Sequence, residues 1–515
     1  MNHSLRFHSI LFGQLEPGGE LDDPAQPPFL RDLNLDQVID SMTVDRLEYR
    51  LDAFFYTPLR DVDTVRYRHA VFRDLEDPPL LESIGAFAQQ MHAMRTRLVQ
   101  ADRLHYKYEK EGWFLDATAT YCDAVSSLAE RLSGLDVTSR GLLAFRDYLL
   151  GYTHSSAFTA LATETRQMQA ALAQVTYRVH VKGHRVRVGK QDDEPDYSVE
   201  VEKTFARFKQ GAVKDYRVRL STGLGMNHVE ARILELVARL YRDVFQELDG
   251  YCGRHRDYVD PTIRAFDREV QFYLAYLQLI EPLKGAGLPF CYPHVSARSK
   301  EVCAVEAFDL ALAGKLVHEN SPVVCNDLSL SGAERVLVVT GPNQGGKSTF
   351  ARMFGQLHYL ASLGCPVPGK EARLFLPDRL FTHFEREEDV RTLRGKLEDE
   401  LVRLRDILRE STSDSVVIMN ESLTSTSLSD AVLLGKEVMR QLVELDLLCV
   451  WVTFVDELSA LSEATVSMVS TVAPDNPAVR TYAIVRRPAD GRAYAAAIAE
   501  KYGLTYDTLR GRIAT

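Results

Sequence analysis

One motif in the chain fixes the structure of the residues around it. Residues 341–348 read Gly-Pro-Asn-Gln-Gly-Gly-Lys-Ser, which fits the pattern G-x-x-x-x-G-K-S of a phosphate-binding loop. An apolar run, residues 336–339, precedes the motif and predicts a buried strand, and a helical pattern follows it from Ser348 to about Leu363. A glycine-rich loop between a strand and a helix is the context in which this motif binds phosphates. We therefore expect an α/β domain built around this loop.

The loop residues predict how a nucleoside triphosphate is held. The glycines let backbone N–H groups close around phosphates, and the helix N-terminus adds a favourable dipole. Lys347 would reach the β- and γ-phosphates, and the Ser348 hydroxyl would ligate Mg²⁺. The alternative is a chance glycine-rich turn. The residues predicted to bind the triphosphate are Gly341, Pro342, Asn343, Gln344, Gly345, Gly346, Lys347, Ser348 and Thr349.

The residues around the loop resemble the MutS family of DNA mismatch-repair ATPases. Thr-Gly-Pro-Asn-x-Gly-Gly-Lys-Ser-Thr, residues 340–349, is similar to that family's nucleotide-binding loop. Further similar segments follow in the family's order, at residues 379–382, 416–421, 424–430 and 452–458. The resemblance covers roughly residues 320–515. It implies an ABC-type P-loop ATPase domain of α/β fold that uses ATP and Mg²⁺.

The resemblance assigns chemistry to two residues at the end of the expected strand 416–420. In the family an acidic pair ends this strand; its first carboxylate holds the Mg²⁺ shell, and the second orients or deprotonates the attacking water. Here Asn420 takes the first position and Glu421 the second. Because an amide carries no negative charge, we expect Asn420 to hold Mg²⁺ less well. Glu421 and Lys347 are the predicted catalytic residues, and Ser348 and Asn420 the predicted metal ligands.

Three further positions depart from the family pattern. Phe454 stands where the family has a His that senses the γ-phosphate, and Val323 stands where it has an aromatic residue that stacks on adenine. Gly395 falls on a Ser that reaches the γ-phosphate of the partner subunit; its backbone N–H or the flanking Arg394 and Lys396 could substitute, or the segment is only a charged helix start. These departures imply slow hydrolysis, weaker base selectivity, or both. The intact loop implies that phosphate binding is retained.

The sequence before the ATPase match predicts a mainly α-helical region. Residues 1–30 are acidic and rich in Gly and Pro, which predicts a flexible or loosely docked arm. Residues 31–300 show apolar positions at spacings of three and four, which predicts packed amphipathic helices. The resemblance implies that these are core and lever helices, whereas the residues alone favour a generic helical bundle. Residues 301–515 then form the predicted ATPase and dimerisation domain.

A short segment within the helical region has a different pattern. Residues 176–190 alternate apolar and basic side chains around Gly183, which predicts a β-hairpin with one basic face. Like charges across a hairpin repel, so contact with nucleic-acid phosphates would explain them. An edge hairpin whose charges block aggregation explains them equally well. The neighbouring acidic residues 192–196 would oppose phosphate. By resemblance, the hairpin would be a reduced form of the family's DNA-contacting clamp.

Composition limits the partners and the compartment. The formal net charge of −11 over 515 residues does not suggest a nucleic-acid binder that relies on bulk charge, so any DNA contact would come from local basic patches. No apolar run approaches the roughly 20 residues that span a bilayer. The N-terminal residues lack a signal-peptide pattern. The seven cysteines are scattered without C-x-x-C spacing, which predicts a reducing, cytoplasmic location and no structural zinc.

Two functions follow from these observations. The resemblance implies a dimeric clamp on duplex, mismatched or branched DNA, opened and closed by nucleotide, that acts in mismatch repair or on structured DNA. No segment resembles the family's mismatch-reading or connector domains, so direct mismatch reading is not implied. Residues 493–510 resemble the family's C-terminal helix-turn-helix, which packs on a partner subunit and implies a homodimer. The alternative is a hydrolysis-deficient, nucleotide-gated protein scaffold that does not act on DNA, favoured by the negative net charge and by Asn420.

Overall fold

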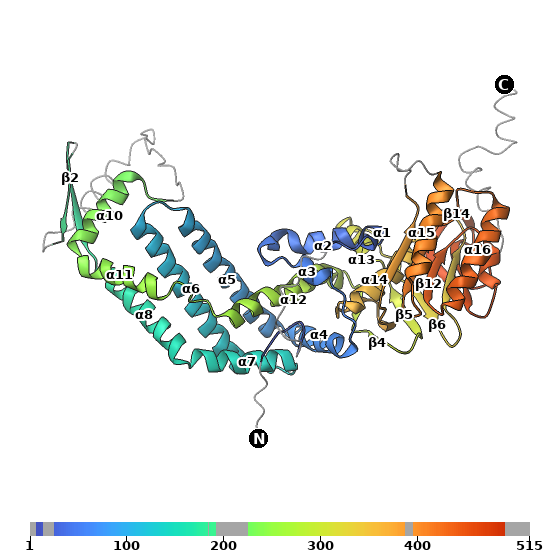
Figure 1. Cartoon of the computed structure of the whole chain (residues 1–515), viewed down its shortest axis with the longest axis horizontal. Helices are drawn as coiled ribbons and strands as arrows, with labels where there is room; N and C mark the ends of the chain where they lie inside the picture. Colours follow the sequence, from blue (N-terminus) through green and yellow to red (C-terminus); the bar gives the residue numbers. More distant parts are fainter. Residues whose placement is uncertain (1–6, 14–24, 184, 192–224, 387–394, 490–515) are drawn as a thin grey trace, which may run out of the picture. The chain divides into compact units, whose positions relative to one another are not determined.

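The computed structural model describes residues 7–13, 25–183, 185–191, 225–386 and 395–489. These residues form two compact units (Figure 1). The first unit comprises Leu75–Thr138 and Leu142–Asp267 with Phe7, and the second comprises His8–Asp74, Ser139–Gly141 and the chain from Arg268 onward. The acidic stretch 192–196, the basic residues before Gly395 and the C-terminal stretch 493–510 lie outside the described residues. The boundaries at residues 31 and 301 stay predictions from the sequence.

The first unit is built from long helices, as the spacing of apolar residues predicts. Its elements are α5 (Pro78–Arg103), α6 (Lys107–Ser133), α7 (Arg140–Thr153), α8 (Ser156–Ala173), α10 (His228–Leu240), α11 (Arg242–Arg254) and the start of α12 (Pro261–Gly285). A cluster of buried side chains joins four of these helices. It includes Leu115 of α6, Met168 of α8, Val237 of α10, and Phe245 and Tyr251 of α11. Burial of such side chains stabilises the unit by roughly 1.5–3 kcal/mol each.

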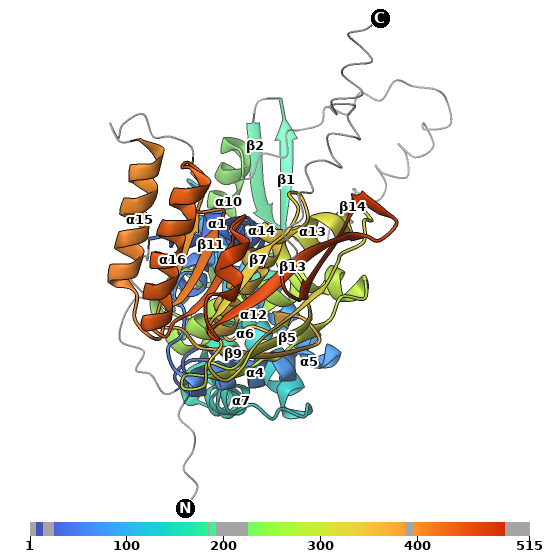
Figure 2. The same ribbon diagram turned by 90° about the vertical axis from the view of Figure 1, so that its right-hand side faces the viewer.

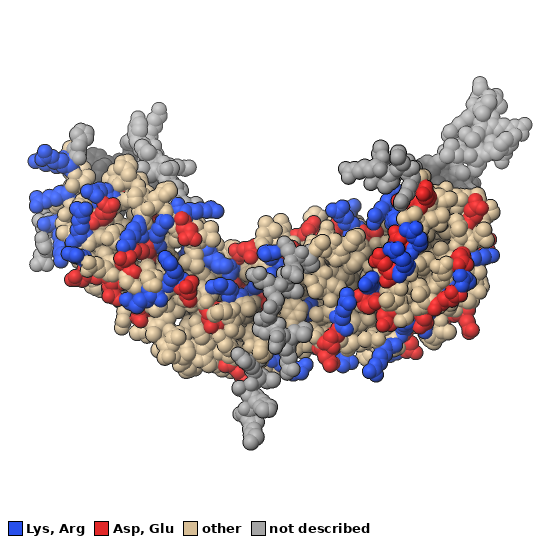
Figure 3. Space-filling model, in the orientation of Figure 1, with Lys and Arg blue, Asp and Glu red and all other residues tan. Residues whose placement is uncertain are grey.

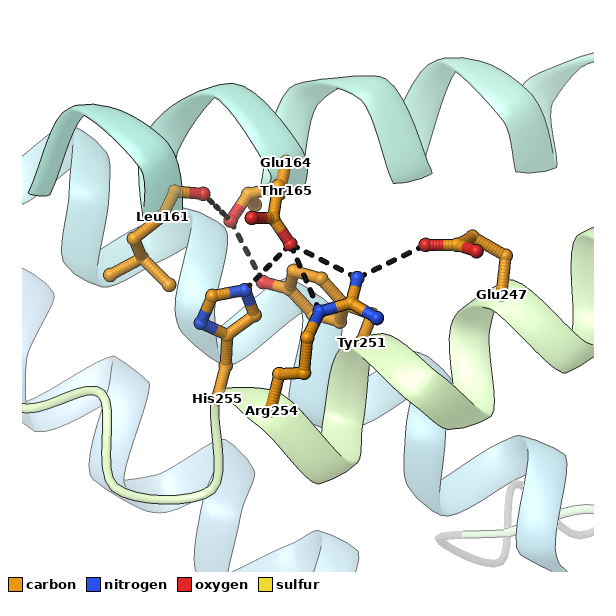
Figure 4. A network of polar contacts seen from close by, with 7 residues as sticks. All are labelled: Leu161, Glu164, Thr165, Glu247, Tyr251, Arg254 and His255. Carbon is orange, nitrogen blue, oxygen red and sulfur yellow. Dashed lines mark hydrogen bonds and ion pairs between the residues drawn. The ribbon is translucent and has the colours of Figure 1, made fainter. Parts of the chain in front are cut away.

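Polar contacts also fasten α11 to α8 (Figure 4). The Glu164 carboxylate of α8 accepts hydrogen bonds from the guanidinium of Arg254, at 3.0 and 3.3 Å, and lies 3.0 Å from Nε2 of His255. These donors lower the pKa of Glu164. Beneath this exposed pair, the buried hydroxyl groups of Thr165 and Tyr251 lie 2.8 Å apart. The two contacts fix the rotation of α11 about its axis, because they lie on one face of the helix.

A two-stranded hairpin occupies the segment in which the sequence predicts one. Strand β1 (Tyr177–Lys182) pairs antiparallel with β2 (Arg185–Lys190). In this register His180 lies opposite Arg187, and Lys182 opposite Arg185. Since side chains alternate between faces, one face carries these basic groups with Arg178, and the other carries the apolar residues. Figure 3 shows Lys and Arg gathered over the part of the unit that carries β2.

The second unit is organised around a six-stranded sheet. The strand order is β10 (Leu380–Phe384), β11 (Val416–Asn420), β12 (Leu448–Val452), β7 (Val336–Thr340), β13 (Thr465–Ala473) and β14 (Asn476–Arg486). The first five strands run parallel, and β14 is antiparallel to β13. Strands β7, β11 and β12 are buried along their whole length. Such continuous apolar strands are typical of a parallel sheet covered on both faces.

Helices cover both faces of this sheet (Figure 2). The helix α14 (Lys347–Ser362) packs on one face, where a Cβ atom on its Gly355 would lie 3.3 Å from Ile418 of β11. The helices α15 (Lys396–Glu410) and α16 (Leu428–Glu444) pack on the other face. There Val338, Met419 and Trp451 share one apolar cluster with side chains of these two helices. The two layers hold the sheet between them and so fix the position of its strand ends.

Smaller elements complete the second unit. A four-stranded sheet has the order β4 (His294–Ser296), β9 (Glu371–Phe375), β5 (Val302–Ala307) and β6 (Asn326–Leu330), and β3 (Phe290–Cys291) pairs with β8 (Val367–Pro368). The remaining elements are α1 (Phe29–Asp32), α2 (Leu35–Thr43), η1 (Val44–Tyr49), α3 (Asp52–Phe55), α4 (Val62–Leu75), α13 (Leu310–His318) and η2 (Asp456–Ala460). All seven cysteines are free thiols.

The described part of the expected N-terminal arm is firmly packed. Ile10 and Leu11 are fully buried within the second unit. The carboxylate of Glu269, on α12, accepts hydrogen bonds from the Ile10 backbone N–H at 2.8 Å and from the Ser9 hydroxyl at 2.9 Å. The buried guanidinium of Arg68 donates to the Leu11 carbonyl at 3.0 Å. The expectation of a loose arm is therefore wrong for residues 7–13, because apolar burial and these bonds outweigh the acidic, Gly- and Pro-rich character of the region as a whole.

No helix among the described residues combines the length and the hydropathy that crossing a membrane requires.

Candidate functional site

The parallel strands of the large sheet bring the predicted site residues to one edge. Asn420 at the end of β11 lies in register with Val452 of β12, and Val452 lies in register with Val339 of β7. The segments that leave these strands therefore begin side by side. In open α/β sheets, ligands bind outside the carboxyl ends of the strands. The carboxyl end of the sheet carries the glycine-rich loop after β7 and Glu421 after β11.

The loop backbone needs glycine at its two ends. Gly341 has φ +112° and Gly346 has φ +89°, which are backbone conformations that residues with a Cβ atom rarely adopt. A Cβ on Gly341 would also lie 2.9 Å from the Ser470 carbonyl oxygen of β13. Helix α14 begins at Lys347, directly after the loop. The loop thus turns tightly from the central strand into a helix whose first N–H groups face the strand ends, an arrangement suited to an anion.

Lys347 lies over the loop and is almost fully buried. Its ammonium donates hydrogen bonds to the carbonyl oxygens of Gly341 at 2.9 Å and Pro342 at 3.1 Å, and to Oδ1 of Asn343 at 3.1 Å. Burial lowers the pKa of Lys347, and the negative charge of Glu421 partly opposes this shift. A phosphate oxygen would give the same ammonium a charged acceptor in place of neutral ones, which roughly doubles the strength of such a bond.

Two consecutive residues, Asn420 and Glu421, lie at the carboxyl end of β11. Asn420 is 9% exposed, and its buried Oδ1 has no hydrogen-bond partner among the described residues. Glu421 leaves the strand with φ +54°, fixed by its backbone N–H, which donates to the Val452 carbonyl at 2.9 Å. A buried oxygen without a donor costs free energy unless a ligand satisfies it. The free amide oxygen of Asn420 therefore fits a neutral oxygen ligand for a cation.

These residues fit Mg²⁺ only as part of a site shared with a nucleotide. Among the described residues, no group of three or more His, Cys, Asp or Glu side chains is placed to hold a metal ion. Mg²⁺ is usually bound through one or two protein oxygens together with substrate phosphates and water. Ser348, half-buried in the first turn of α14, and Asn420 could provide the two protein oxygens. Both are neutral, so the phosphates would supply most of the negative charge.

The structure adds loop contacts that the motif does not reveal. The buried Ser470 hydroxyl, on β13, donates to the Gly345 carbonyl at 2.7 Å. The Arg480 guanidinium of β14 donates to the Asn343 carbonyl at 3.2 Å. The sequence does not single out Ser470, because its strand also contains Thr465, Ser467 and Thr471. Arg480 has no signal in the sequence either, because only the pairing of β13 with β7 and β14 brings it to the loop.

An aromatic residue also lies beside the loop. Tyr482 of β14 is 52% exposed and has φ +60°, and a Cβ atom on Gly346 would lie 3.6 Å from its carbonyl oxygen and 3.7 Å from its Cβ atom. The amide side chain of Asn326 holds this strained turn, because it donates to the Tyr482 carbonyl at 3.2 Å and accepts from the Ile484 N–H at 2.6 Å. The structure thus brings an exposed aromatic residue next to Gly346, from a strand in which the sequence predicts no site residue.

A buried polar layer lies behind Glu421. His383 of β10 is fully buried, and its Nδ1 lies 2.7 Å from the hydroxyl of Ser422. Burial, with the nearby charge of Arg403 as a smaller cause, lowers the pKa of His383 to about 3, so the imidazole is neutral. Ser425 donates a hydrogen bond to the buried carboxylate of Glu400 on α15. These contacts tie the residues that follow Glu421 to β10 and α15.

The structure also describes the other residues that the sequence predicts for the site. Phe454 follows β12 and is 49% exposed, so its ring is available at the edge that carries the loop. Val323 is half-buried in the segment before β6, and its contact with a base stays a prediction. Gly395 is exposed at the start of α15. In the predicted Thr/Ser-rich loop, Ser427 caps α16 by accepting a hydrogen bond from the Asp430 N–H at 3.2 Å.

The fold and the site define the class to which the chain belongs. The second unit is a mixed helical and α/β structure with a parallel sheet, the class used by nucleotide-binding ATPase domains. Residues 337–509 match the family model of MutS domain V, the ATPase domain of that family. This stretch of the chain is therefore similar to the ATPase domain of the MutS family. This agrees with the resemblance seen in the loop and the segments after it.

Two curated relatives extend the comparison beyond the matched domain. Both are named DNA mismatch repair protein MutS and come from two strains of Chloroflexus aurantiacus. Each is 27% identical to this chain over 257 residues, which is 49% of this chain and 24% of the relative. The chain therefore matches about a quarter of the length of these relatives.

Proposed function

We propose that the chain is a MutS-type ATPase that binds ATP with Mg²⁺ at the loop of residues 341–349 and uses the nucleotide to control a dimeric clamp on DNA. One observation carries the nucleotide part: the loop lysine, Lys347, and Glu421 lie after the carboxyl ends of two parallel strands, β7 and β11, that flank β12, and the charge of Glu421 partly opposes the lowering of the Lys347 pKa by burial. A cationic triphosphate site with a carboxylate beside it is the arrangement that phosphoryl transfer to water requires.

Each residue then has a defined part in the reaction. The N–H groups of the loop and of the first turn of α14 bind the phosphates, and Lys347 neutralises their charge. Glu421, positioned by its bond to the Val452 carbonyl, orients the attacking water and accepts its proton. When bound, Mg²⁺ would offset the negative charge of the phosphates, with Ser348 and Asn420 as its protein ligands. Tyr482 is placed to contact the base, a role for which Val323 alone offers no ring.

We expect hydrolysis to be slow. Asn420 gives the metal a neutral oxygen, where a carboxylate would contribute a charge. Phe454 presents an apolar ring at the strand edge and has no hydrogen-bond donor for a phosphate oxygen. Neither change affects the loop backbone or Lys347. Tight nucleotide binding with slow turnover suits a protein in which the bound nucleotide holds a conformation for a long time.

The DNA part of the proposal rests on the hairpin and on the family. The β1–β2 hairpin has a basic face that includes Lys182, Arg185 and Arg187, all exposed, and none of its residues carries a carboxylate. A concentrated basic patch on an otherwise acidic chain is the footprint expected of phosphate contact. The match to the MutS family supports duplex, mismatched or branched DNA as the ligand and a homodimer as the assembly. The scattered cysteines support a cytoplasmic location.

ATP turnover by the full chain tests the proposal. Turnover would be measured with Mg²⁺ alone and with homoduplex, mismatched and junction DNA at low salt, where phosphate contacts are strongest. We expect slow basal turnover, stimulation by at least one DNA, and loss of both in Lys347→Ala. Absence of ATP binding in the wild-type protein would contradict the nucleotide part, and absence of binding to every DNA, with or without ATP, would contradict the DNA part.

A second function is favoured by Asn420 and Phe454 together with the net charge of −11. In this alternative the chain is a hydrolysis-deficient scaffold in which ATP holds the dimer and the helical unit binds protein. It predicts ATP-dependent dimerisation without turnover. DNA-stimulated hydrolysis that is lost in Glu421→Gln would exclude it.

A further inference from the structure

The second unit contains a cavity of about 420 Å³ in which the proposed nucleotide-binding residues take no part. Its walls come from α1, the segment before α4, the C-terminal half of α14, the segment 377–382 and the end of α15. Drug-sized ligands occupy pockets of roughly 300–1,000 Å³ that are mainly apolar with a few polar groups. The size of this cavity therefore fits a small organic molecule.

Aromatic rings and prolines form the apolar part of the wall. Phe29 and Tyr359 meet edge to face, with ring centroids 5.2 Å apart. The Tyr359 hydroxyl donates to the Phe55 carbonyl at 2.5 Å, which fixes its ring. Phe381 of β10 and the prolines Pro28, Pro58 and Pro377 complete this part. Such side chains lose little conformational entropy on binding, so the wall is preorganised for a flat apolar group.

The charged part of the wall has an excess of unpaired positive charge. The carboxylate of Asp378 already accepts hydrogen bonds from Ser415 at 2.9 Å and Thr412 at 2.8 Å. Glu410 lies 4.0 Å from Arg379. Two further arginines in the wall, Arg60 and Arg386, are exposed and form no ion pair with any described carboxylate. Unpaired guanidinium groups bind phosphate, sulfonate or carboxylate, often through two parallel bonds.

The surroundings favour a small molecule over an extended peptide. The outer edge of β10 is covered by α1: the Thr382 hydroxyl donates to the Asp32 carboxylate at 2.6 Å, and Arg352 donates to the Asp32 carbonyl at 2.9 Å. A peptide strand cannot add to a sheet edge that is already covered. The cavity lies beside this covered edge, so its ligand must be held by side chains.

We propose that this cavity binds a small anion that carries a flat aromatic group, with the aromatic group against Phe29, Tyr359 and Phe381 and the anionic group on Arg60 and Arg386. The last turns of α14 and strand β10 form part of the cavity wall. The helix α14 begins at Lys347, and β10 pairs with β11, which ends at Asn420. The site is separate from the proposed nucleotide site, so its existence does not depend on ATP binding there.

Binding of 1-naphthyl phosphate to the full chain tests this proposal, with fluorescence of the naphthyl group as the readout. The Lys347→Ala protein is used beside the wild type, because it removes the phosphate-binding lysine of the loop and leaves the cavity unchanged. We expect saturable 1:1 binding to both proteins. We expect 1-naphthol, which lacks the anion, to bind at least about tenfold more weakly, because it cannot form charged hydrogen bonds to the two arginines.

Charge reversal locates the site. The double variant Arg60→Glu, Arg386→Glu should lose at least tenfold in affinity for 1-naphthyl phosphate, and the control Arg298→Glu, an exposed arginine outside the cavity wall, should bind as the wild type does. Circular dichroism checks that the fold is kept. Equal affinity in the double variant and the control would overturn the proposal, and so would saturable binding that Lys347→Ala abolishes, or no saturable binding to the wild type at millimolar concentration.

Discussion

The Ser470 hydroxyl and the Gly345 carbonyl form a buried hydrogen bond of 2.7 Å that joins β13 to the phosphate-binding loop. A Cβ atom on Gly345 would lie 2.1 Å from this hydroxyl and 2.9 Å from the Pro342 carbonyl. We therefore expect Gly345→Ala to displace the loop and to reduce ATP affinity by at least a hundredfold, as measured by titration calorimetry. Ser470→Ala removes only the bond, which contributes about 1 kcal/mol, and should weaken ATP binding several-fold.

The control for this prediction is Gly314→Ala, in α13, where a Cβ would meet no atom within 4 Å. It should leave ATP affinity unchanged. If Gly345→Ala and Gly314→Ala bound ATP equally well, the close packing of the loop against β13 would have no part in nucleotide binding.

Asn420 offers a gain-of-function test. Asn420→Asp places a negative charge where the strand end faces the proposed metal, at nearly unchanged volume. A charged ligand should hold Mg²⁺ more tightly and raise ATP turnover by roughly tenfold or more, as expected for about 1.5–3 kcal/mol of added interaction. Steady-state phosphate release across a Mg²⁺ titration would show both effects. The double variant Asn420→Asp, Glu421→Gln should turn over ATP more slowly than the wild type. Equal turnover by the single variant Asn420→Asp and the double variant would argue against Glu421 as the base.

Local sequence predicted some parts of the fold better than others. The glycine loop with the apolar run before it placed β7 and α14 correctly, since motif and periodicity describe residues that are neighbours in the chain. The sequence could not reveal that Ser470, Arg480 and Tyr482 reach this loop, because that depends on which strands pair in the sheet. The tight packing of residues 7–13 was missed for a similar reason: it depends on Glu269, which is about 260 residues away in the chain.

Tyr482 and Asn326 test the base-contacting side of the site. Tyr482→Ala removes the exposed ring beside Gly346, and stacking of a base on an aromatic ring contributes roughly 1–3 kcal/mol. We expect its ATP affinity to fall at least about fivefold, while affinity for inorganic triphosphate, which has no base, stays unchanged. Asn326→Ala should show the same pattern more weakly, because it only releases the turn that positions the ring. An equal loss for both ligands would indicate a general distortion of the loop.

Glu269 predicts a pH dependence of stability. Burial raises its pKa to about 7, although the bonds from Ser9 and Ile10 and the charge of Arg68 favour the carboxylate. A carboxyl group whose pKa is raised on folding contributes stability fully below its unfolded pKa of about 4.3 and loses it as the pH rises through 7. The full loss is about 4 kcal/mol, of which about 2.5 kcal/mol falls between pH 5 and 8. Urea unfolding between pH 5 and 8 measures it.

Glu269→Gln should flatten this profile, because a neutral amide does not titrate. Its matched control is Glu281→Gln, an exposed glutamate on the same helix α12. The control should keep the wild-type slope. Hydrogen exchange at Ile10 and Leu11 should rise with pH in the wild type beyond the intrinsic increase. A Glu269→Gln profile as steep as that of the wild type would assign the pH dependence to other groups.

Charge reversal on the hairpin separates the two explanations of its basic face. Arg185 and Arg187 lie on the same face of β2, opposite Lys182 and His180. Glutamates at both positions would block edge-to-edge pairing no less than arginines do, because any charge on an edge opposes association. They cannot contact a phosphate. If the face binds DNA, Arg185→Glu, Arg187→Glu should lower affinity at least tenfold and reduce the salt dependence of binding by about one unit for each lost phosphate contact.

The matched control for the hairpin variant is Val181→Thr, Val186→Thr, a pair of opposed and exposed residues on the other face. This control keeps the charge of every side chain and nearly the same side-chain volumes. Its DNA affinity and the slope of its salt dependence should equal those of the wild type. Fluorescence anisotropy with labelled duplex and junction DNA at several salt concentrations gives both quantities. If charge reversal leaves them unchanged and the protein stays monodisperse, the basic face serves only to protect the hairpin edge, and DNA contact must then come from another part of the chain.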